Sequence, residues 1–224
     1  MAIGLCKIMG FRLPENFNNP YLSSSITEFW RRWHMTLGSW MKNYLYIPLG
    51  GNKVDSSFKL YRNLMIVFLA SGLWHGASWN FIVWGAFHGL FLVLERLFLL
   101  NVYSKVGKVV STIITFLLVV IGWVYFRLED LSYANQVVKQ MLSFNFIDGK
   151  FSLHNDFYFS LTLAAVFSFF AFIPFTQKIQ LKVYGENHTS TSNTVMLFIS
   201  VCLFYISLSY IAALDFNPFI YFRF

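Results

Sequence analysis

Two histidines in apolar surroundings are the residues of this sequence best suited to chemistry. His75 lies in the segment Ser71–Gly76, inside a run with no Asp, Glu, Lys or Arg between Arg62 and Glu95. A run of this length reaches membrane depth, where an ionisable side chain is costly and usually functional. The glycines and tryptophans around it predict an opened backbone, which a bilayer tolerates only around an enclosed or wet cavity. The structural alternative is a buried histidine satisfied by a neighbouring carbonyl.

Proton transfer is the chemistry that these residues suit best. Imidazole titrates near neutrality, so a desolvated neutral histidine can take the proton of a hydroxyl that attacks an acyl carbonyl. We predict His75 and His34 as the catalytic pair. The residues expected to shape the pocket or attract an anionic substrate are Trp74, Trp79, Asn80, Arg31 and Arg32. For the two arginines, a solvated or headgroup-facing arc is the competing interpretation, and for the other three it is plain packing.

Other kinds of site have little support. No His or Cys stands three or four positions after either histidine, and no HExxH or paired-cysteine pattern occurs. Cys6 and Cys202 are isolated, one near each end of the chain. No G-x-S-x-G elbow marks a serine nucleophile. The sequence therefore predicts no metal site and no bound cofactor.

The three remaining histidines are more simply explained by structural or surface positions. His88 stands seven positions before Glu95, on the same face of a helix, so we expect it to hydrogen-bond across helices. A direct part in function is the alternative. His154 and His188 fall in polar connecting segments and are expected to be ordinary surface residues.

The composition is that of a membrane protein. Hydrophobic residues make up 57% of the 224 positions and charged residues 12%, and 27 residues are Phe. The formal charge of +7 comes from Lys and Arg in short stretches beside apolar runs, a pattern typical of contacts with lipid headgroups. We therefore predict an all-α polytopic membrane protein, with lipids as partners and no nucleic acid.

The region 1–63 holds eight of the 17 basic residues and no spanning segment. Ser25 and Glu28 have the spacing of a capping box, which predicts a helix from Ile26 to about Tyr46. One stripe of that helix would hold Thr27, Trp30, His34, Leu37, Met41 and Leu45. A basic, tryptophan-rich amphipathic helix is expected in the membrane interface, and the basic excess places this region in the cytoplasm.

The region 64–224 is predicted to hold the membrane helices. The run from Asn63 should break at Gly72–Gly76 and resume from about Ser78 to Leu99, as two short crossings or as one broken one. Asp130 should cap a short amphipathic helix that ends near Leu142. Further spans are expected at Val109–Phe126, Phe157–Phe175 and Thr194–Leu214, with a polar loop at Lys178–Asn193.

Three separated motifs carry a resemblance to the membrane-bound O-acyltransferase family. They are Phe29–Leu37 (FWRRWHMTL), Tyr44–Asn52 (YLYIPLGGN) and Gly72–Gly76 (GLWHG), in the order expected for the family. Trp123–Arg127 and Phe219–Phe224 resemble its C-terminal portion. The second motif is more similar to the branch that O-acetylates alginate than to the branch that moves D-alanine to teichoic acids.

The resemblance implies one membrane-embedded O-acyltransferase domain over 1–224, corresponding to the C-terminal half of longer family members. It implies His75 as the active-site histidine and His34 as the second histidine. It also implies a cytoplasmic thioester donor such as acetyl-CoA, an exported polysaccharide acceptor, and extracytoplasmic acetyltransferase partners at a bacterial inner membrane. The alternatives are a non-enzymatic conduit or scaffold subunit of a polysaccharide-modifying complex, and an inactive fragment of the enzyme.

Overall fold

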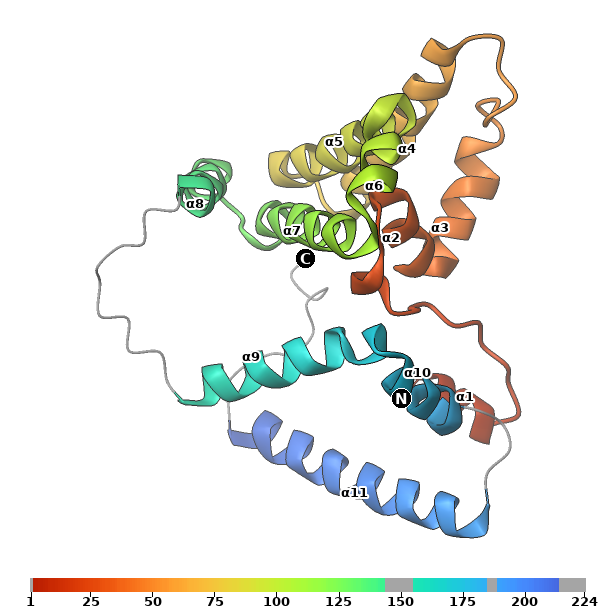
Figure 1. Cartoon of the computed structure of the whole chain (residues 1–224), viewed down its shortest axis with the longest axis vertical. Coiled ribbons are helices and arrows are strands. Elements are labelled where there is room, and N and C mark those ends of the chain that lie inside the picture. The colour runs from red at the N-terminus through yellow and green to blue at the C-terminus, as the bar shows by residue number, and fades with distance from the viewer. Residues whose placement is uncertain (1, 144–154, 185–188, 214–224) are drawn as a thin grey trace. The chain divides into compact units, whose positions relative to one another are not determined.

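The computed structural model describes residues 2–143, 155–184 and 189–213, and within these ranges it contains helices and no strand (Figure 1). The predicted all-α class is confirmed. The chain divides into two compact units, Met1–Ile173 and Pro174–Phe224.

The first unit holds most of the helices. They are α1 (Ala2–Ile8), α2 (Ile26–Arg32), α3 (Met35–Met41), α4 (Ser57–His75), α5 (Trp79–Leu94), α6 (Leu100–Val106), α7 (Lys108–Arg127), α8 (Leu131–Ser143) and α9 (Asn155–Ser168). Shorter pieces are the 3₁₀ turns η1 (Pro20–Leu22) and η4 (Phe170–Phe172) and the π-helical turns η2 (Lys42–Tyr46) and η3 (Glu95–Leu99). The second unit holds α10 (Pro174–Tyr184) and α11 (Ser190–Ala213).

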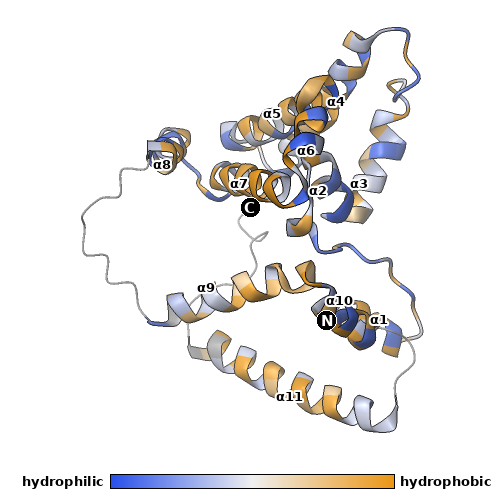
Figure 2. Ribbon diagram, in the orientation of Figure 1, coloured by the Kyte–Doolittle hydropathy of each residue, from blue (hydrophilic) through white to orange (hydrophobic). Residues whose placement is uncertain are grey.

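Three helices of the described chain are long and apolar enough to cross a membrane. They are Trp79–Val106, which joins α5, η3 and α6, then Lys108–Arg127 and Ser190–Ser209. Figure 2 shows hydrophobic residues along α7 and α11. The chain is therefore a multi-pass membrane protein, and the spans predicted near 109–126 and 194–214 are confirmed over their described residues.

Two predictions about the C-terminal part are wrong in detail. The span expected at Phe157–Phe175 is divided, because α9 and η4 end at Phe172 and Pro174 opens a new helix. Proline suits the first turn of a helix, since its missing N–H has no partner there anyway. The polar loop expected from Lys178 is instead helical through Tyr184, and α11 already begins at Ser190. The motif Phe219–Phe224 lies outside the described residues.

Helices α4 and α5 form an antiparallel hairpin held by glycines. A Cβ at Gly72 would lie 2.3 Å from the carbonyl oxygen of Phe81, and a Cβ at Gly85 would lie 2.3 Å from that of Phe68. The two helices are therefore in direct backbone contact, as small residues permit between membrane helices. The predicted break is confirmed, but it is narrower than expected, because α4 runs through Gly72 and ends at His75.

The long helix predicted from Ile26 to Tyr46 is wrong, because it breaks at His34. Ser25 caps α2 as predicted, accepting a hydrogen bond from the Glu28 N–H at 3.0 Å, although the Glu28 carboxylate bonds Ser24 rather than Ser25. The helix ends at Arg32, and His34 has φ +47° before α3 begins. The expected stripe therefore does not continue past His34.

Helix α2 packs against protein on its apolar side. Ile26 and Phe29 are fully buried in a core with Leu92 of α5 and Val119 of α7. The buried Glu95 carboxylate accepts hydrogen bonds from the N–H groups of Ile26 and Thr27, while Trp30 contacts His88. These pairs make α2 antiparallel to α5, so its C-terminal end lies beside the start of α5.

The helix predicted after Asp130 is confirmed as α8. The Asp130 side chain accepts the Tyr133 N–H at 2.6 Å, which is the expected capping bond. Ala134 is fully buried and Val137 is half-buried, so this side of α8 faces the protein, whereas Met141 is exposed.

Candidate functional site: a histidine pair among aromatic rings

His34 is held in a strained backbone conformation by a loop that precedes α2. Its φ of +47° lies in the left-handed region, which is uncommon for residues other than glycine. Asn18 donates its N–H to the Arg32 carbonyl at 2.9 Å, and Met35 donates its N–H to the Asn16 carbonyl at 2.9 Å. This loop thereby satisfies the backbone groups that the break would leave unpaired.

The side chain of Asn16 also fixes the His34 ring. Its Oδ1 accepts the Thr36 N–H at 3.0 Å and the Thr36 hydroxyl at 2.7 Å, and lies 3.3 Å from Nδ1 of His34. Burial lowers the pKa of the half-buried His34 below its ordinary value, which favours the neutral ring. A neutral ring that donates Nδ1–H to Asn16 keeps its Nε2 lone pair for a proton.

His75 is the last residue of α4 and sits among aromatic rings. Its centroid lies 4.8 Å from that of Trp74, 5.3 Å from Trp84 and 4.9 Å from Phe126, all edge-to-face. Phe81 stacks on it at 6.1 Å. Within the described ranges no hydrogen-bond partner of the His75 ring is found, so no carbonyl satisfies it. The ring is half-buried, with polar nitrogens and apolar walls.

The turn after His75 depends on close packing. A Cβ at Gly76 would come within 2.6 Å of the Phe81 ring, so a side chain at this position would displace one wall of the histidine. Ser78 then caps α5 through the Asn80 N–H at 3.4 Å. The break that the glycines predict therefore serves to reverse the chain and to present His75 at the end of a helix.

The structure brings His34 and His75 to one site. The two imidazoles lie close enough to interact electrostatically. A series of ring contacts also connects them through the protein. Phe17 contacts His34 at 6.2 Å and Trp33 at 4.9 Å. Trp33 contacts Trp123 at 4.9 Å, Trp123 contacts Phe126 at 5.6 Å, and Phe126 contacts His75. The two histidines predicted as a catalytic pair therefore come from two separate segments of the chain.

The other predicted site residues are placed less uniformly. Trp74 is 58% exposed and contacts His75, whereas Trp79 is 70% exposed. Asn80 is buried, and its side-chain amide donates to the Leu128 carbonyl, which ties the start of α5 to the end of α7. Arg31 is exposed, and Arg32 forms an ion pair with Glu28 at 2.6 Å. Substrate binding by these five residues stays a prediction.

Sequence reasoning missed several residues around the pair. The sequence does not single out Asn16, Trp84 or Phe126 as neighbours of the histidines. Phe126 does lie in the Trp123–Arg127 motif, which was a usable signal. Nothing local marked Asn16 or Glu95, because their partners are 18 to 20 and 68 to 69 positions away.

His88 packs between helices. It is 1% exposed, and its ring contacts Trp30 at 5.0 Å and Trp84 at 5.2 Å, both edge-to-face. A Cβ at Gly122 would lie 2.7 Å from its Nε2, so α5 and α7 approach closely here. Its buried Nδ1 has no hydrogen-bond partner among the described residues, so the predicted cross-helix bond is not observed. His154 and His188 lie outside the described residues.

Within the described ranges, no three His, Cys, Asp or Glu side chains lie together as a metal site would require. Cys6 and Cys202 are free thiols. The arrangement offers two imidazoles, one with a defined hydrogen-bonded nitrogen, and aromatic walls around the other. It can accept, hold and return a proton beside a substrate carbonyl.

The described residues thus define a multi-pass α-helical membrane protein with a histidine pair at one end of its helical hairpin. The model of the membrane-bound O-acyltransferase family, MBOAT, matches residues 1–128, and the chain belongs to this family. His34, His75 and their aromatic surroundings all lie within the matched residues.

Curated relatives support this membership. The chain is 39% identical over its whole length to the probable alginate O-acetylase AlgI of Pseudomonas putida, of which the alignment covers 49%. It is 55% identical over 144 residues, 64% of this chain, to the AlgI of Pseudomonas aeruginosa, covering 28% of that protein. The peptidoglycan O-acetyltransferase of Helicobacter pylori is 45% identical over 65% of this chain and 28% of its own length. The chain spans about half the length of the curated relatives it matches, or less.

Proposed function

We propose that this chain is the histidine-bearing part of a membrane O-acyltransferase that transfers an acyl group, acetyl first of all, to hydroxyls of an exported polysaccharide such as alginate. The observation that carries the proposal is the approach of His34 and His75 within one aromatic-walled site. Family membership and the names of relatives that O-acetylate alginate or peptidoglycan support it.

His75 acts as the general base in this proposal. Its neutral imidazole takes the proton of the acceptor hydroxyl while that oxygen attacks the carbonyl carbon of a thioester. The tetrahedral intermediate collapses, the carbon–sulfur bond breaks, and the imidazolium returns the proton to the departing thiolate. The products are one ester and one thiol. Positioned general-base help of this kind contributes roughly 10²–10⁴ in rate.

His34 assists His75 from the neighbouring segment. Its Nδ1 faces Asn16 at 3.3 Å, so Nε2 is the nitrogen free to orient a hydroxyl or to share the proton. Burial favours the neutral form of His34, and this matters because a protonated His34 would oppose proton uptake by His75.

The donor in this proposal is a cytoplasmic acyl thioester such as acetyl-CoA, and the protein itself holds no cofactor. Of the two arginines predicted to bind substrate, the exposed Arg31 is the one free to attract an anionic group, since Arg32 is already paired with Glu28. The acceptor hydroxyl belongs to the polysaccharide or to an extracytoplasmic acetyltransferase protein that passes the acyl group on to it, and the setting is the inner membrane of a bacterium.

The test is the ester content of the cell's polysaccharide in strains that carry His75→Ala or His34→Ala. His154→Ala is the matched control, because sequence places that histidine in a polar connecting segment. At equal protein level we expect His75→Ala to lower O-acetyl content by about a hundredfold or more. His34→Ala should lower it less, and the control should leave it unchanged.

Two outcomes would redirect the proposal. Unchanged O-acetyl content in both variants contradicts an enzymatic role and favours the conduit or scaffold interpretation. No O-acetylation from the 224-residue chain, in a host where the Pseudomonas putida relative supports it, assigns the activity to the longer protein and makes this chain inactive alone.

A further inference from the structure

The start of α2 is tied to a neighbouring helix by one buried carboxylate. Glu95, where α5 passes into η3, is 1% exposed and lies within the span Trp79–Val106. One of its oxygens accepts the Ile26 N–H, and the other accepts the Thr27 N–H at 2.9 Å and the Thr27 hydroxyl at 2.6 Å. An ionisable group at membrane depth is costly and usually functional, so this contact calls for a role.

The Glu95 hydrogen bonds complete the capping of α2. The first N–H groups of a helix have no partner within the helix itself. Ile26 and Thr27 donate theirs to Glu95, and Glu28 donates its own to the Ser25 hydroxyl at 3.0 Å. A cap supplied by a side chain of another helix also fixes where α2 begins relative to that helix.

Other contacts do not set the position of α2 along its neighbours. Among the described residues, the hydrogen bonds of Glu95 are the only ones that join α2 to the helices α4 to α7. Phe29 and Trp30 pack against these helices through apolar and ring contacts. Apolar packing is not directional, so it holds α2 against its neighbours without fixing its register. The hydrogen bonds of Glu95 fix that register.

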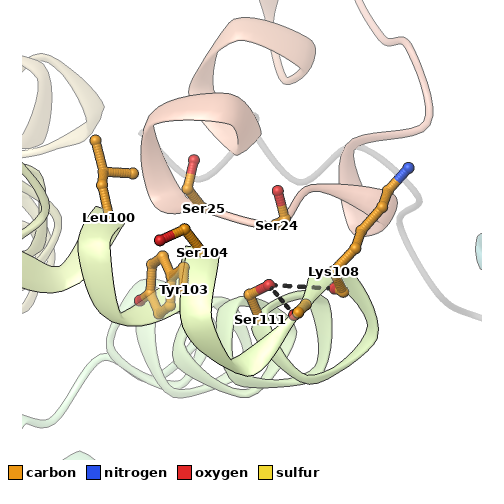
Figure 3. A pocket seen from close by; sticks show the side chains of 8 residues that line it. Ser24, Ser25, Leu100, Tyr103, Ser104, Lys108 and Ser111 are labelled. Atoms are coloured by element: carbon orange, nitrogen blue, oxygen red, sulfur yellow. Dashed lines mark hydrogen bonds between the residues drawn. The ribbon is translucent and has the colours of Figure 1, made fainter.

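The packing around the start of α2 is open on one side. A pocket of about 370 Å³ lies between the residues just before α2 and the region where α6 meets α7. Figure 3 shows Ser24 and Ser25 on one side of this pocket and Tyr103 on the other. The side chains of both serines form their hydrogen bonds with Glu28, within their own segment. The start of α2 therefore has room to move once Glu95 no longer holds it.

The other end of α2 leads directly to His34. The helix has seven residues and ends at Arg32, two positions before His34. It contains no Pro or Gly, the residues at which helices usually kink, so a shift of its start carries through to its end. His75 lies on the α4–α5 hairpin, which Glu95 continues. The hold of Glu95 on α2 therefore determines how His34 meets His75.

We propose that Glu95 is a positioning residue of the histidine site: its carboxylate holds the start of α2, and α2 in turn holds His34 against His75. The π-helical turn that begins at Glu95 supports this role, because such turns are rare and frequently occur at functional sites. The consequence for catalysis rests on the proposed acyl transfer, whereas the effect on His34 does not.

The first experiment measures how fast diethyl pyrocarbonate modifies His34 in the purified 224-residue chain in detergent, by peptide mass spectrometry between about pH 5 and 8. Glu95→Gln keeps the size of the side chain but replaces one acceptor oxygen by an NH₂ donor, which opposes the donors of α2. Glu129→Gln, at an exposed carboxylate after α7, is the matched control. Thr27→Val and Thr27→Ser differ in the hydroxyl that Glu95 accepts, and they decide the question if Glu95→Gln does not fold. Thermal unfolding shows which variants are folded.

We expect Glu95→Gln to speed the modification of His34 about tenfold at neutral pH, the effect of losing a hydrogen bond to a carboxylate. The midpoint of the pH profile should rise toward the ordinary histidine pKa of about 6.5, because a released His34 ring is better solvated. Thr27→Val should speed the modification about threefold, while Thr27→Ser and Glu129→Gln match the wild-type chain. A folded Glu95→Gln protein with the wild-type rate and midpoint overturns the proposal, as do equal rates in the two Thr27 variants.

The second experiment asks whether Glu95 acts through His34. The O-acetyl content of the polysaccharide is compared at equal protein level in strains with Glu95→Gln, with His34→Ala and with both. We expect Glu95→Gln alone to lower the content about tenfold and to add nothing in the His34→Ala background, because residues that act as one unit are not additive. An equal further loss in that background overturns the positioning role. If His34→Ala itself leaves the content unchanged, the proposed acyl transfer fails, and the labelling rates alone decide whether Glu95 places His34.

Discussion

At the scale of single residues, Asn16 decides the geometry of the histidine pair. One side-chain oxygen accepts from Thr36 twice and faces His34, while its backbone carbonyl accepts the Met35 N–H. The left-handed conformation of His34 costs of order 1–3 kcal/mol and persists because these contacts outweigh it. A substitution at Asn16 therefore alters the surroundings of His34 while both histidines are kept.

We predict that Asn16→Ala lowers the free energy of unfolding by about 1–3 kcal/mol, because the Thr36 N–H and hydroxyl lose their acceptor. Asn16→Asp keeps an acceptor oxygen in the same place and should be much less destabilising. Thermal or denaturant unfolding of the two purified variants compares them. Equal losses would mean that the side-chain oxygen does not hold this loop.

The protonation of His34 predicts a pH effect on stability. Burial holds the pKa of folded His34 below the unfolded value of about 6.5, so the unfolded chain takes up a proton first as pH falls. Stability is therefore lost from about pH 6.5 downward until the folded pKa is passed. His34→Asn removes this titration, and Asn tolerates positive φ, so the variant keeps the turn.

Unfolding measured between pH 5 and 8 tests this expectation. The wild-type chain should lose more stability toward pH 5 than His34→Asn does, and the two curves should run parallel above pH 7. Parallel curves over the whole range would show that His34 titrates alike in the folded and unfolded chain.

At the scale of elements, the α4–α5 hairpin depends on backbone contact at glycines. We predict that Gly85→Ala is destabilising by about 1–3 kcal/mol, since the new methyl group would lie 2.3 Å from the Phe68 carbonyl and would force the helices apart. Gly4→Ala in α1 is the matched control, because nothing lies within 4 Å of its Cβ position. Helix propensity alone makes the control neutral or slightly stabilising.

Thermal unfolding of Gly85→Ala and Gly4→Ala in the same detergent separates packing from propensity. A Gly85→Ala protein as stable as the control would mean that the hairpin can open at this point without cost.

Elements that depend on local signals could be predicted from the sequence. The Asp130 cap, the apolar helix α7 and the break near His75 each follow from residues within a few positions of the feature. The break at His34 could not be predicted, because the pattern from Ile26 to Tyr46 is consistent with one helix. The helix ends because Asn16 and Asn18 form hydrogen bonds with backbone groups on either side of His34. The Glu95 contact with the start of α2 is likewise invisible, since its partners lie 68 and 69 positions away.

The candidate site, too, could be predicted only in part. The types and surroundings of His34 and His75 nominated both residues, and the family resemblance assigned each a place. The tertiary structure alone shows that the two histidines approach each other. It also shows that Trp84 and Phe126 wall His75 and that Asn80 donates to the Leu128 carbonyl. Pattern reasoning finds candidates here, and packing determines which of them meet.

At the scale of the first unit, α5 and α7 pack antiparallel, and the two ends of this helix pair carry different residues. Asn80 bonds Leu128, and His88 packs against Gly122, so the start of α5 and the end of α7 lie together with His75. The opposite end carries the α6–α7 turn with Lys105 and Lys108, and also Arg96. Basic residues beside spans favour the cytoplasmic side, which predicts that the turn faces the cytoplasm and that the His75 end lies toward the outside. This prediction differs from the cytoplasmic position expected for 1–63 from its basic excess, because His34 of that region lies at the His75 end.

We predict that cysteines placed at the two ends react from opposite sides of the membrane. In a Cys6→Ser, Cys202→Ser background, Glu129→Cys should react with a membrane-impermeant maleimide in intact cells, because it follows α7 on the His75 side. Lys105→Cys should react only after the cells are permeabilised. Labelling of both in intact cells would contradict two consecutive crossings, and labelling of Lys105→Cys alone would invert the orientation. The expected pattern would place the histidine pair toward the outer face of the membrane.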